Sequence, residues 1–564
     1  MASAVLCVVG PAGAQLTPSP TQGTVVSGQA TITANGNTLT VQQASPVLQV
    51  DWTAFNIGQG GVVRFQQPSG QSLAVNRVTG TTASTLSGQL SANGRVVLIN
   101  PNGVLFTSTS TVDVAGLLAT TLSLVGGPVT GNTFTVEAGA NVGNVTHDGT
   151  ISLSGAGGFA ALIGAQVTHS GQITGNNAQV ALSAAGRVRV DLGNGLGLLV
   201  EQGVLNALVR HNGQIRTPGG RVYMNALSAT ALGASVVNHE GVTEAQATVQ
   251  GPGGQIFLQA GPQAGEVRIS GTMDVSSGSS QAAGFIETRS TTLSLVDGTD
   301  LRMGSAGGAA GQLRLTAGSM TVGTAPVGNV ANPGAPMVSS TALGQALGGA
   351  DLKLETLASL GGNGDMTVQG ALNWNTRSAV KLVSAGALTL KSDVAGTAAA
   401  SSLDALAATQ IRLEGSELRA GNVFIESPTL RLSAVNTPVT AGQPATVSTA
   451  RVNGGSVVLR GQDVLMDNAQ VSSQGDLSVD MMSGAQTVAG TTTVRGGSSL
   501  SASAALRMRS DVMSVRADAS AGATRPLLRG EIVDIVGESK LWVEQAKIEG
   551  GTGFYEDVES DDKL

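Results

Sequence analysis

Four histidines are the side chains of this sequence best suited to binding a metal ion, and the chain has no others. His147, His169, His211 and His239 each stand at the centre of a V-x-H-x-G unit. If a repeat places these units above one another, neighbouring imidazoles could share a metal ion. A zinc site, however, needs three or four ligands held tetrahedrally, whereas a column of equivalent positions supplies only a line. The pattern therefore favours a structural stack of histidines, each ahead of a turn glycine.

No other group of residues has the spacing of a catalytic or metal site. Residues 361–365, GGNGD, match a calcium-binding nonapeptide only in part and occur once, whereas such sites need consecutive copies. The signatures of serine hydrolases, zinc proteases and nucleotide-binding loops are absent from the sequence. Asp148, Glu240 and Glu287 form no visible pair. We therefore assign no catalytic residue, no metal site and no cofactor, and expect that the protein is not an enzyme.

The histidine units also reveal a repeat that must position them. The valines that open the units are Val145, Val167, Val209 and Val237, so the second gap is nearly twice as long as the first, and the third is somewhat longer than the first. A rung of about 20–22 residues, with one skipped rung and one insertion, accounts for these gaps and lies within the range of solenoid repeats. Short strands of alternating apolar residues, set off by Gly, Asn or Ser, recur between the units. The same rhythm continues through residues 301–545.

The composition supports a solenoid of short strands. Hydrophobic residues make up 41% of the 564 residues, aromatic residues only 2%, and 79 residues are glycine. The predicted fold is all-β: a single-stranded, right-handed parallel β-helix with an amino-terminal cap. A hairpin around Asn35-Gly36 within residues 30–43, followed by a strand through Trp52, would form that cap. The net charge of −7 argues against a nucleic-acid partner.

The ends and two composition-biased stretches carry further expectations. Residues 1–14, which contain the lone Cys7, are predicted to be the remnant of a signal peptide whose basic start lies upstream. No run of apolar residues is long enough for a transmembrane span. Residues 328–350 and 395–409, rich in Ala, Gly, Ser and Thr, are expected to be loops, the second with a short helix around residues 403–408. Residues 546–564 are assigned as an acidic tail, of which Tyr555–Leu564 is expected to fray.

The most informative short motif of the sequence is the turn Asn100-Pro101-Asn102-Gly103. The apolar run Val96–Ile99 precedes it and predicts a strand buried on both faces, and a second strand resumes at Val104. Pro101 and Gly103 are turn formers. We expect the Asn102 side chain to bond its own backbone, and Gly103 to resist substitution if its φ is positive. The turn is expected to set the path between two rungs.

The residues around this turn follow a fixed order that resembles a known family. Residues 55–57 (FNI), 63–65 (VRF), 76–80 (NRVTG) and 86–88 (LSG) lead into LINPNGV at residues 98–104. Over about residues 20–290, the chain resembles the amino-terminal secretion domain of the filamentous haemagglutinin family, the exoproteins of two-partner secretion. It is most similar to the high-molecular-weight adhesin type. The second family motif, NPNL, is absent here.

The resemblance implies a function and a set of site residues. It implies a secretion motif made of Asn76, Arg77, Asn100, Pro101, Asn102 and Gly103, within a secretion domain of residues 15–300. It also implies export by an outer-membrane β-barrel transporter with POTRA domains, to the medium or cell surface of a Gram-negative bacterium. There the protein would act as an adhesin on a glycan or protein of a host or neighbouring cell. The alternatives are an extracellular carbohydrate-active β-helix enzyme and a haem-carrier-binding exoprotein.

Overall fold

The computed structural model describes residues 19–140, 142–155, 157–229, 235–262, 264–324, 336–437, 446–481, 490–517, 524–550 and 554–557. The predicted signal-peptide remnant lies outside these residues. The chain divides into two compact units. The first contains the described residues up to Gly175 together with Gly186–Glu201, and the second contains Asn176–Ala185 and the described residues from Gln202 onwards.

The first unit is a parallel β-helix whose rung length agrees with the predicted repeat. One face stacks strands in parallel, so that Leu73 pairs with Arg95 and Arg95 with Gly116, each one predicted rung length further along the chain. On a second face, Ser84 pairs with Val104, and Val145 pairs with Val167. The two residues of each pair are again about one predicted rung length apart in the sequence. The first face consists of β4 (Val47–Trp52), β6 (Leu73–Val78), β9 (Arg95–Ile99), β12 (Gly116–Thr120) and β17 (Phe159–Gly164). The second consists of β7 (Ser84–Leu86), β10 (Val104–Phe106), β15 (Val145–His147) and β18 (Gln166–His169).

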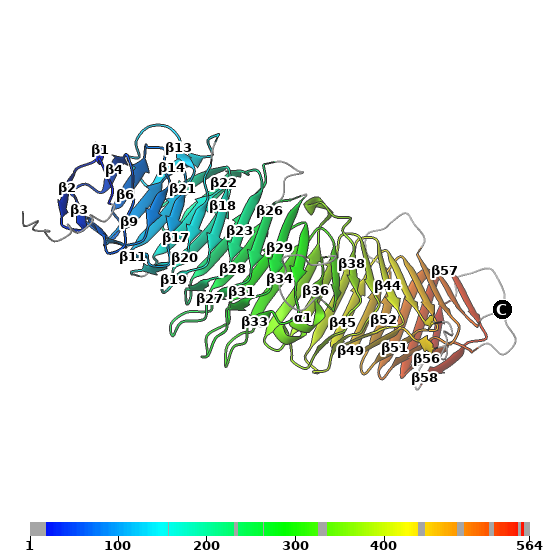
Figure 1. Ribbon diagram of the computed structural model, residues 1–564. Coiled ribbons are helices and arrows are strands. Elements are labelled where there is room, and N and C mark those ends of the chain that lie inside the picture. The colour runs from blue at the N-terminus through cyan, green and yellow to red at the C-terminus, as the bar shows by residue number, and fades with distance from the viewer. Residues whose placement is uncertain are drawn as a thin grey trace, which may run out of the picture. The chain divides into compact units, whose positions relative to one another are not determined.

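A third face completes each rung and carries the cap (Figure 1). It stacks β3 (Thr38–Gln43), β5 (Val62–Gln66), β8 (Gln89–Ala92), β11 (Thr111–Val114), β16 (Thr150–Leu153) and β19 (Gln172–Thr174). The predicted hairpin is confirmed, because β2 (Ala30–Asn35) pairs antiparallel with β3. In addition β1 (Thr24–Ser27) pairs antiparallel with β4. Antiparallel strands at this end occupy the backbone groups that a terminal rung would otherwise leave open.

The prediction of a strand buried on both faces is also confirmed. Every side chain of β9 is buried, and the same holds for β12 and β17. A strand buried on both faces reads as a continuous apolar run, as Val96–Ile99 does. An antiparallel sheet of β13 (Ser123–Leu124), β14 (Thr133–Glu137), β21 (Arg187–Asp191) and β22 (Gly197–Gln202) lies outside the rungs. It contacts the first face through a hydrogen bond from Arg95 to the Leu192 carbonyl oxygen.

The prediction of a skipped rung was wrong. The long gap between Val167 and Val209 contains β21 and β22, which pair in the antiparallel sheet and form no rung. The shorter gap that follows joins neighbouring strands, because Val209 pairs directly with Val237. Sequence spacing alone could not distinguish an inserted pair of strands from a rung without histidine.

The second unit also stacks parallel strands, from its first segment, Asn176–Ala185, to the last described residues (Figure 1). One face runs through β20 (Gln179–Ala184), β25 (Arg221–Ala226), β28 (Gln255–Ala260), β31 (Phe285–Arg289), β34 (Gly311–Ala317), β37 (Ala350–Thr356) and β40 (Ala379–Ser384). The segment assigned as the acidic tail contains β58 (Lys547–Gly550) and β59 (Phe554–Asp557), which pair in parallel with β56 (Leu527–Gly530) and β57 (Ile532–Glu544).

The helix expected around residues 403–408 is wrong. That segment is β43 (Ser402–Ala407), which pairs in parallel with β40 and β45 (Glu417–Glu426). Its buried residues Leu403, Ala405 and Ala407 alternate with half-buried ones, which is the period of a strand. The described α-helix is α1 (Ser340–Ala346), in the other Ala/Gly-rich stretch, where the Ser339 hydroxyl accepts from the Ala342 N–H as its cap. Among the described residues, no helix is long and apolar enough to cross a membrane.

Candidate functional site

The predicted turn forms a corner between two faces of a single rung. It joins β9, which pairs with β6 and β12, to β10, which pairs with β7 and β15. The expectation that this turn connects two rungs is therefore wrong. The turn nevertheless contacts the rungs on both sides, because the Ser84 N–H donates to the Gly103 carbonyl (3.0 Å) and the Gly143 N–H to the Pro101 carbonyl (2.8 Å).

Asn100 organises the turn from inside. Its side chain is fully buried. The side-chain amide donates to the Thr82 carbonyl (3.0 Å) and to the Ser84 hydroxyl (2.9 Å), and its Oδ1 accepts from the Asn102 N–H (3.1 Å). The side chain that bonds the turn's own backbone is thus that of Asn100, and the assignment of this role to Asn102 was wrong. Sequence alone did not distinguish the two asparagines, because either position of a turn can accept such a bond.

Asn102 instead connects the turn to the preceding rung. Its Nδ2 donates to the Gly80 carbonyl (2.9 Å) and to Asn100 Oδ1 (3.0 Å). Gly80 closes the segment that begins at Asn76 and Arg77, so the two halves of the predicted motif meet here. Gly103 closes the turn with its N–H donating to the Asn100 carbonyl (3.1 Å).

Gly103 occupies a conformation that other residues rarely adopt. Its φ is 131°, and an added Cβ would lie 3.3 Å from the Ala83 Cβ. The expectation that Gly103 resists substitution depended on a positive φ, and its φ is positive. Gly143, on the next rung, leaves no room either, since a Cβ there would lie 2.5 Å from the Gly103 nitrogen.

Asn76 is the buried polar centre of the strands before the turn. The Trp52 Nε1–H donates to its Oδ1 (3.0 Å), and its Nδ2 donates to the Val97 carbonyl (3.3 Å). Asn76 therefore connects β4, β6 and β9 through one side chain. Burying an amide is favourable only when its donors and acceptors are paired, and these bonds meet that requirement.

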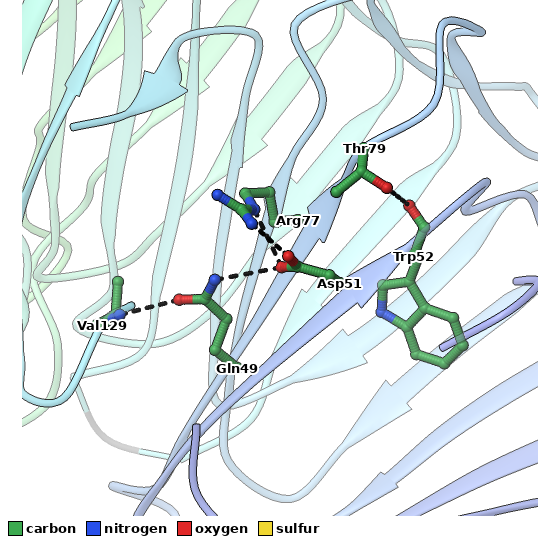
Figure 2. Close-up of polar contacts among 6 residues, drawn as sticks. All are labelled: Gln49, Asp51, Trp52, Arg77, Thr79 and Val129. Carbon is green, nitrogen blue, oxygen red and sulfur yellow. Dashed lines mark hydrogen bonds and ion pairs between the residues drawn. The ribbon is translucent and has the colours of Figure 1, made fainter. Parts of the chain in front are cut away.

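Arg77 forms an ion pair at the surface of the same strand. Its guanidinium binds both carboxylate oxygens of Asp51, with Nε 3.0 Å from Oδ1 (Figure 2). Gln49 donates to the same Asp51 (3.2 Å) and accepts from the Val129 N–H (2.9 Å). Bonding to Asp51 raises the pKa of Arg77. The network holds the inserted segment at Val129 against β4, although no sequence signal connects Gln49 or Asp51 with Arg77.

Arg95 is a second buried connection that sequence analysis did not identify. It is 6% exposed, donates to the Leu192 carbonyl and to Gln71 Oε1, and lies 5.9 Å from the centre of the Phe159 ring. Among the described residues it forms no ion pair, and burial lowers its pKa. Its charge is stabilised by carbonyl dipoles and an aromatic face instead.

Replacing Arg95 with methionine should destabilise the first unit. Methionine keeps the apolar stem but leaves the Leu192 carbonyl and the Gln71 amide oxygen without their donor, at a cost of about 1–3 kcal/mol. Urea denaturation followed by tryptophan fluorescence measures the effect. Arg64→Met on the exposed side of β5 is the matched control. If both variants unfold at the wild-type urea concentration, the connection at Arg95 contributes nothing to stability.

The histidines form two pairs inside the rungs. In the first unit His147 and His169 pair in register, with ring centres 5.1 Å apart and nearly parallel planes, and the Phe106 ring packs edge-on against His147. The side chains of all four histidines of the chain are fully buried. Burial lowers the pKa of His147 to about 3, with a further contribution from His169, and that of His169 to about 4. Within the described parts of the chain, no three His, Cys, Asp or Glu residues gather as they would around a metal ion.

One pair of carboxylates was not recognised in the sequence. Glu244 and Asp274 lie opposite each other on β27 (Val242–Glu244) and β30 (Thr272–Asp274). Arg216 lies 3.4 Å from Glu244 on one side, and Arg302 4.0 Å from Asp274 on the other. The Gln246 amide also donates to Asp274 (2.7 Å). Each acid thus has an arginine of its own within 4.0 Å.

Comparison with known proteins finds a family match in the first half of the chain. Residues 14–272 match the family model of the TPS secretion domain. A heme/hemopexin-binding protein of Haemophilus influenzae strain KW20 / Rd is 37% identical over 216 residues, which cover 37% of this chain and 23% of that protein. A second heme/hemopexin-binding protein of Haemophilus influenzae is 50% identical over 86 residues, or 15% of this chain and 9% of that protein. The matched part thus spans less than a quarter of either relative.

Two solved structures are similar at lower identity. The HMW1 secretion domain from Haemophilus influenzae aligns with 72% of this chain and 100% of its own, at 20% identity and a TM-score of 0.48. The filamentous hemagglutinin secretion domain aligns with 51% of this chain and 99% of its own, at 18% identity and a TM-score of 0.31.

Proposed function

Because residues 14–272 belong to the TPS secretion domain family, we propose that this chain is the exported partner of a two-partner secretion system. Its transporter is an outer-membrane β-barrel with POTRA domains, and the chain is released to the medium or displayed at the surface of a Gram-negative bacterium. The family match is the observation that carries this proposal. The remaining rungs form an adhesin or haemagglutinin-like surface that binds a glycan or protein of another cell.

In this proposal Asn76, Arg77 and the corner Asn100–Gly103 serve export through folding geometry. The corner contains no charged residue that could steer a partner, but it fixes how β9 leads into β10. In a helix that grows rung by rung, the newest rung has an open edge. Such an edge can add a strand from the transporter through main-chain hydrogen bonds. Once the next rung forms, that edge is occupied and the transporter is released.

Haem-carrier binding is the second candidate, and the names of the two heme/hemopexin-binding relatives favour it. It uses the same export route, and differs in what the displayed chain binds. The proposal includes no enzymatic step. The carbohydrate-active alternative has less support, since each acid of the pair Glu244 and Asp274 has an arginine of its own within 4.0 Å.

Co-expression tests the export proposal directly. The chain, fused to the signal sequence of a periplasmic protein, is produced in a Gram-negative host with or without a two-partner secretion transporter from the same bacterium, and medium and periplasm are compared by immunoblot. We expect export to the medium only when the transporter is present. Equal amounts in the medium without it, or retention in the periplasm with it, would contradict the proposal. Binding of haem-loaded hemopexin by the purified chain then tests the second candidate.

A further inference from the structure

Three aromatic rings lie together on the outer face of the second unit. The chain is only 2% aromatic, and the large rings of the first unit, such as Trp52 and Phe106, are fully buried. By contrast Tyr223 of β25 is 37% exposed, and Phe257 of β28 and Phe285 of β31 are half-buried. We call these three residues the aromatic platform.

The geometry of the platform leaves part of each ring uncovered. Tyr223 pairs in register with Phe257, and their ring planes are within 6° of parallel, with centres 4.9 Å apart. Parallel rings whose centres lie about 4.5–7 Å apart form a stacked aromatic pair. The Phe285 ring lies 5.8 Å from Phe257, tilted by 62°. The result is a stepped apolar strip held on rigid strands.

Polar side chains surround the strip. Arg221 and Asn225 flank Tyr223 along β25, and Gln255 and Gln259 flank Phe257 along β28. Side chains two positions apart on a strand point to the same face, so these groups frame the rings. The buried Asn225 Oδ1 has no hydrogen-bond partner among the described residues.

The charge of the frame is positive. Arg289 follows Phe285 on β31, and Arg314 of β34 lies 5.7 Å from the centre of the Phe285 ring. Neither arginine nor Arg221 forms an ion pair with another described residue, and Arg314 Nε is buried without a hydrogen-bond partner. The acid on the outer face of these four strands is Glu287, between Phe285 and Arg289, and it pairs in register with Phe257 and with Arg314. Elsewhere in the unit, arginines such as Arg460 and Arg495 do have carboxylate partners.

From this arrangement we propose that the aromatic platform and its polar frame form a binding site for an acidic oligosaccharide. The rings supply the apolar face on which the C–H side of a sugar ring packs, the amides bond its hydroxyls, and the arginines bind its carboxylate or sulfate groups. A flat strip with half-buried rings is too shallow for the desolvated anchor that a protein partner requires. The inference rests on the adhesin proposal, and it names the class of receptor.

Binding by the purified full chain tests this inference independently of export. The probes are fluorescent hexasaccharides of hyaluronan (carboxylated), heparin (sulfated) and chitin (neutral). Comparing the affinities for hyaluronan and heparin shows whether a carboxylate or a sulfate group is preferred. We expect an acidic probe to bind more tightly than chitin. Tyr223→Ala and Phe257→Leu should each weaken that binding by about tenfold, and Arg289→Gln should reduce the preference for acidic probes.

Phe424→Ala is the matched control, because Phe424 is another half-buried ring, with Arg460 5.3 Å from its centre, outside the platform. It should bind as the wild type does. The inference is overturned if neither acidic probe binds, if chitin binds equally well, or if the platform variants bind like the control while melting at the wild-type temperature. Binding of haemin, but of no oligosaccharide, that is lost in Phe257→Leu would also overturn it. Export failure with intact oligosaccharide binding would instead contradict only the export proposal.

Discussion

Gly103→Val should reduce the amount of exported protein by about tenfold or more and leave the chain to be degraded in the periplasm. Valine at a φ of 131° costs about 1–3 kcal/mol, and the Cβ also meets the Ala83 side chain. The strain falls on the corner that orients β10 relative to β9, at a stage when few rungs exist to compensate. The measurement is the amount of protein in the medium, with the transporter co-expressed, and the periplasmic amount is recorded beside it.

Gly126→Val is the matched control for backbone strain. Gly126 also has a positive φ, 88°, but a Cβ there would meet no atom within 4 Å. Export of this variant should stay close to normal, as should export of Arg412→Ala on the outer side of β44 (Gln410–Glu414). Normal export of Gly103→Val with a wild-type melting curve would refute both the motif assignment and its mechanism. Equal losses in Gly103→Val and Gly126→Val would refute only the special role of the corner.

The asparagines of the same corner should differ in a defined order. Asn100→Ala removes the donor to Thr82 and Ser84 as well as the acceptor for the Asn102 N–H, and it does so inside the protein. Asn102→Ala removes the link to the Gly80 carbonyl, which is more exposed. Because a buried group left without its partner costs more than an exposed one, Asn100→Ala should impair export more strongly.

Local patterns in the sequence were sufficient to predict the strands and the repeat. The run Val96–Ile99 predicts a doubly buried strand because only such a strand tolerates consecutive apolar residues. His147 and His169 are one predicted rung length apart in the sequence, which places them on neighbouring rungs. The two residues do pair in register. Asn35-Gly36 predicts the hairpin because its turn needs a residue that tolerates positive φ, and Gly36 has a φ of 58°.

Features that depend on distant parts of the chain could not be predicted. Arg77 finds Asp51, and Arg95 finds Leu192, although each pair is far apart in the sequence, and no local pattern encodes such pairs. The segment around Leu403, Ala405 and Ala407 is compatible with a strand as well as with an Ala-rich helix. The strand forms because β40 and β45 pair with it on either side. The role of Asn100 likewise depends on Thr82 and Ser84, which the rung brings beneath it.

The buried histidine pair of the first unit should make that unit sensitive to mild acid. The pKa values of His147 and His169 in the folded chain are about 3 and about 4, below the ordinary value of 6.5 that the unfolded chain has. The unfolded state therefore binds more protons below pH 6.5, so stability is complete above that pH and falls as the pH decreases toward the folded values. Between pH 7 and pH 5 each histidine should remove about 2 kcal/mol from the free energy of unfolding.

A double variant isolates this contribution. His147→Met/His169→Met fills a similar volume with flexible, uncharged side chains, so its stability should change much less between pH 7 and pH 5. Replacing Trp374 and Trp542 with phenylalanine leaves Trp52, in the first unit, as the single tryptophan, and urea denaturation can then be followed by its fluorescence. Most carboxylates stay ionised in this pH range, so they contribute little to the difference. An equal loss of stability in the double variant and its parent would show that other groups cause the acid sensitivity, and that the histidine stack tolerates protonation.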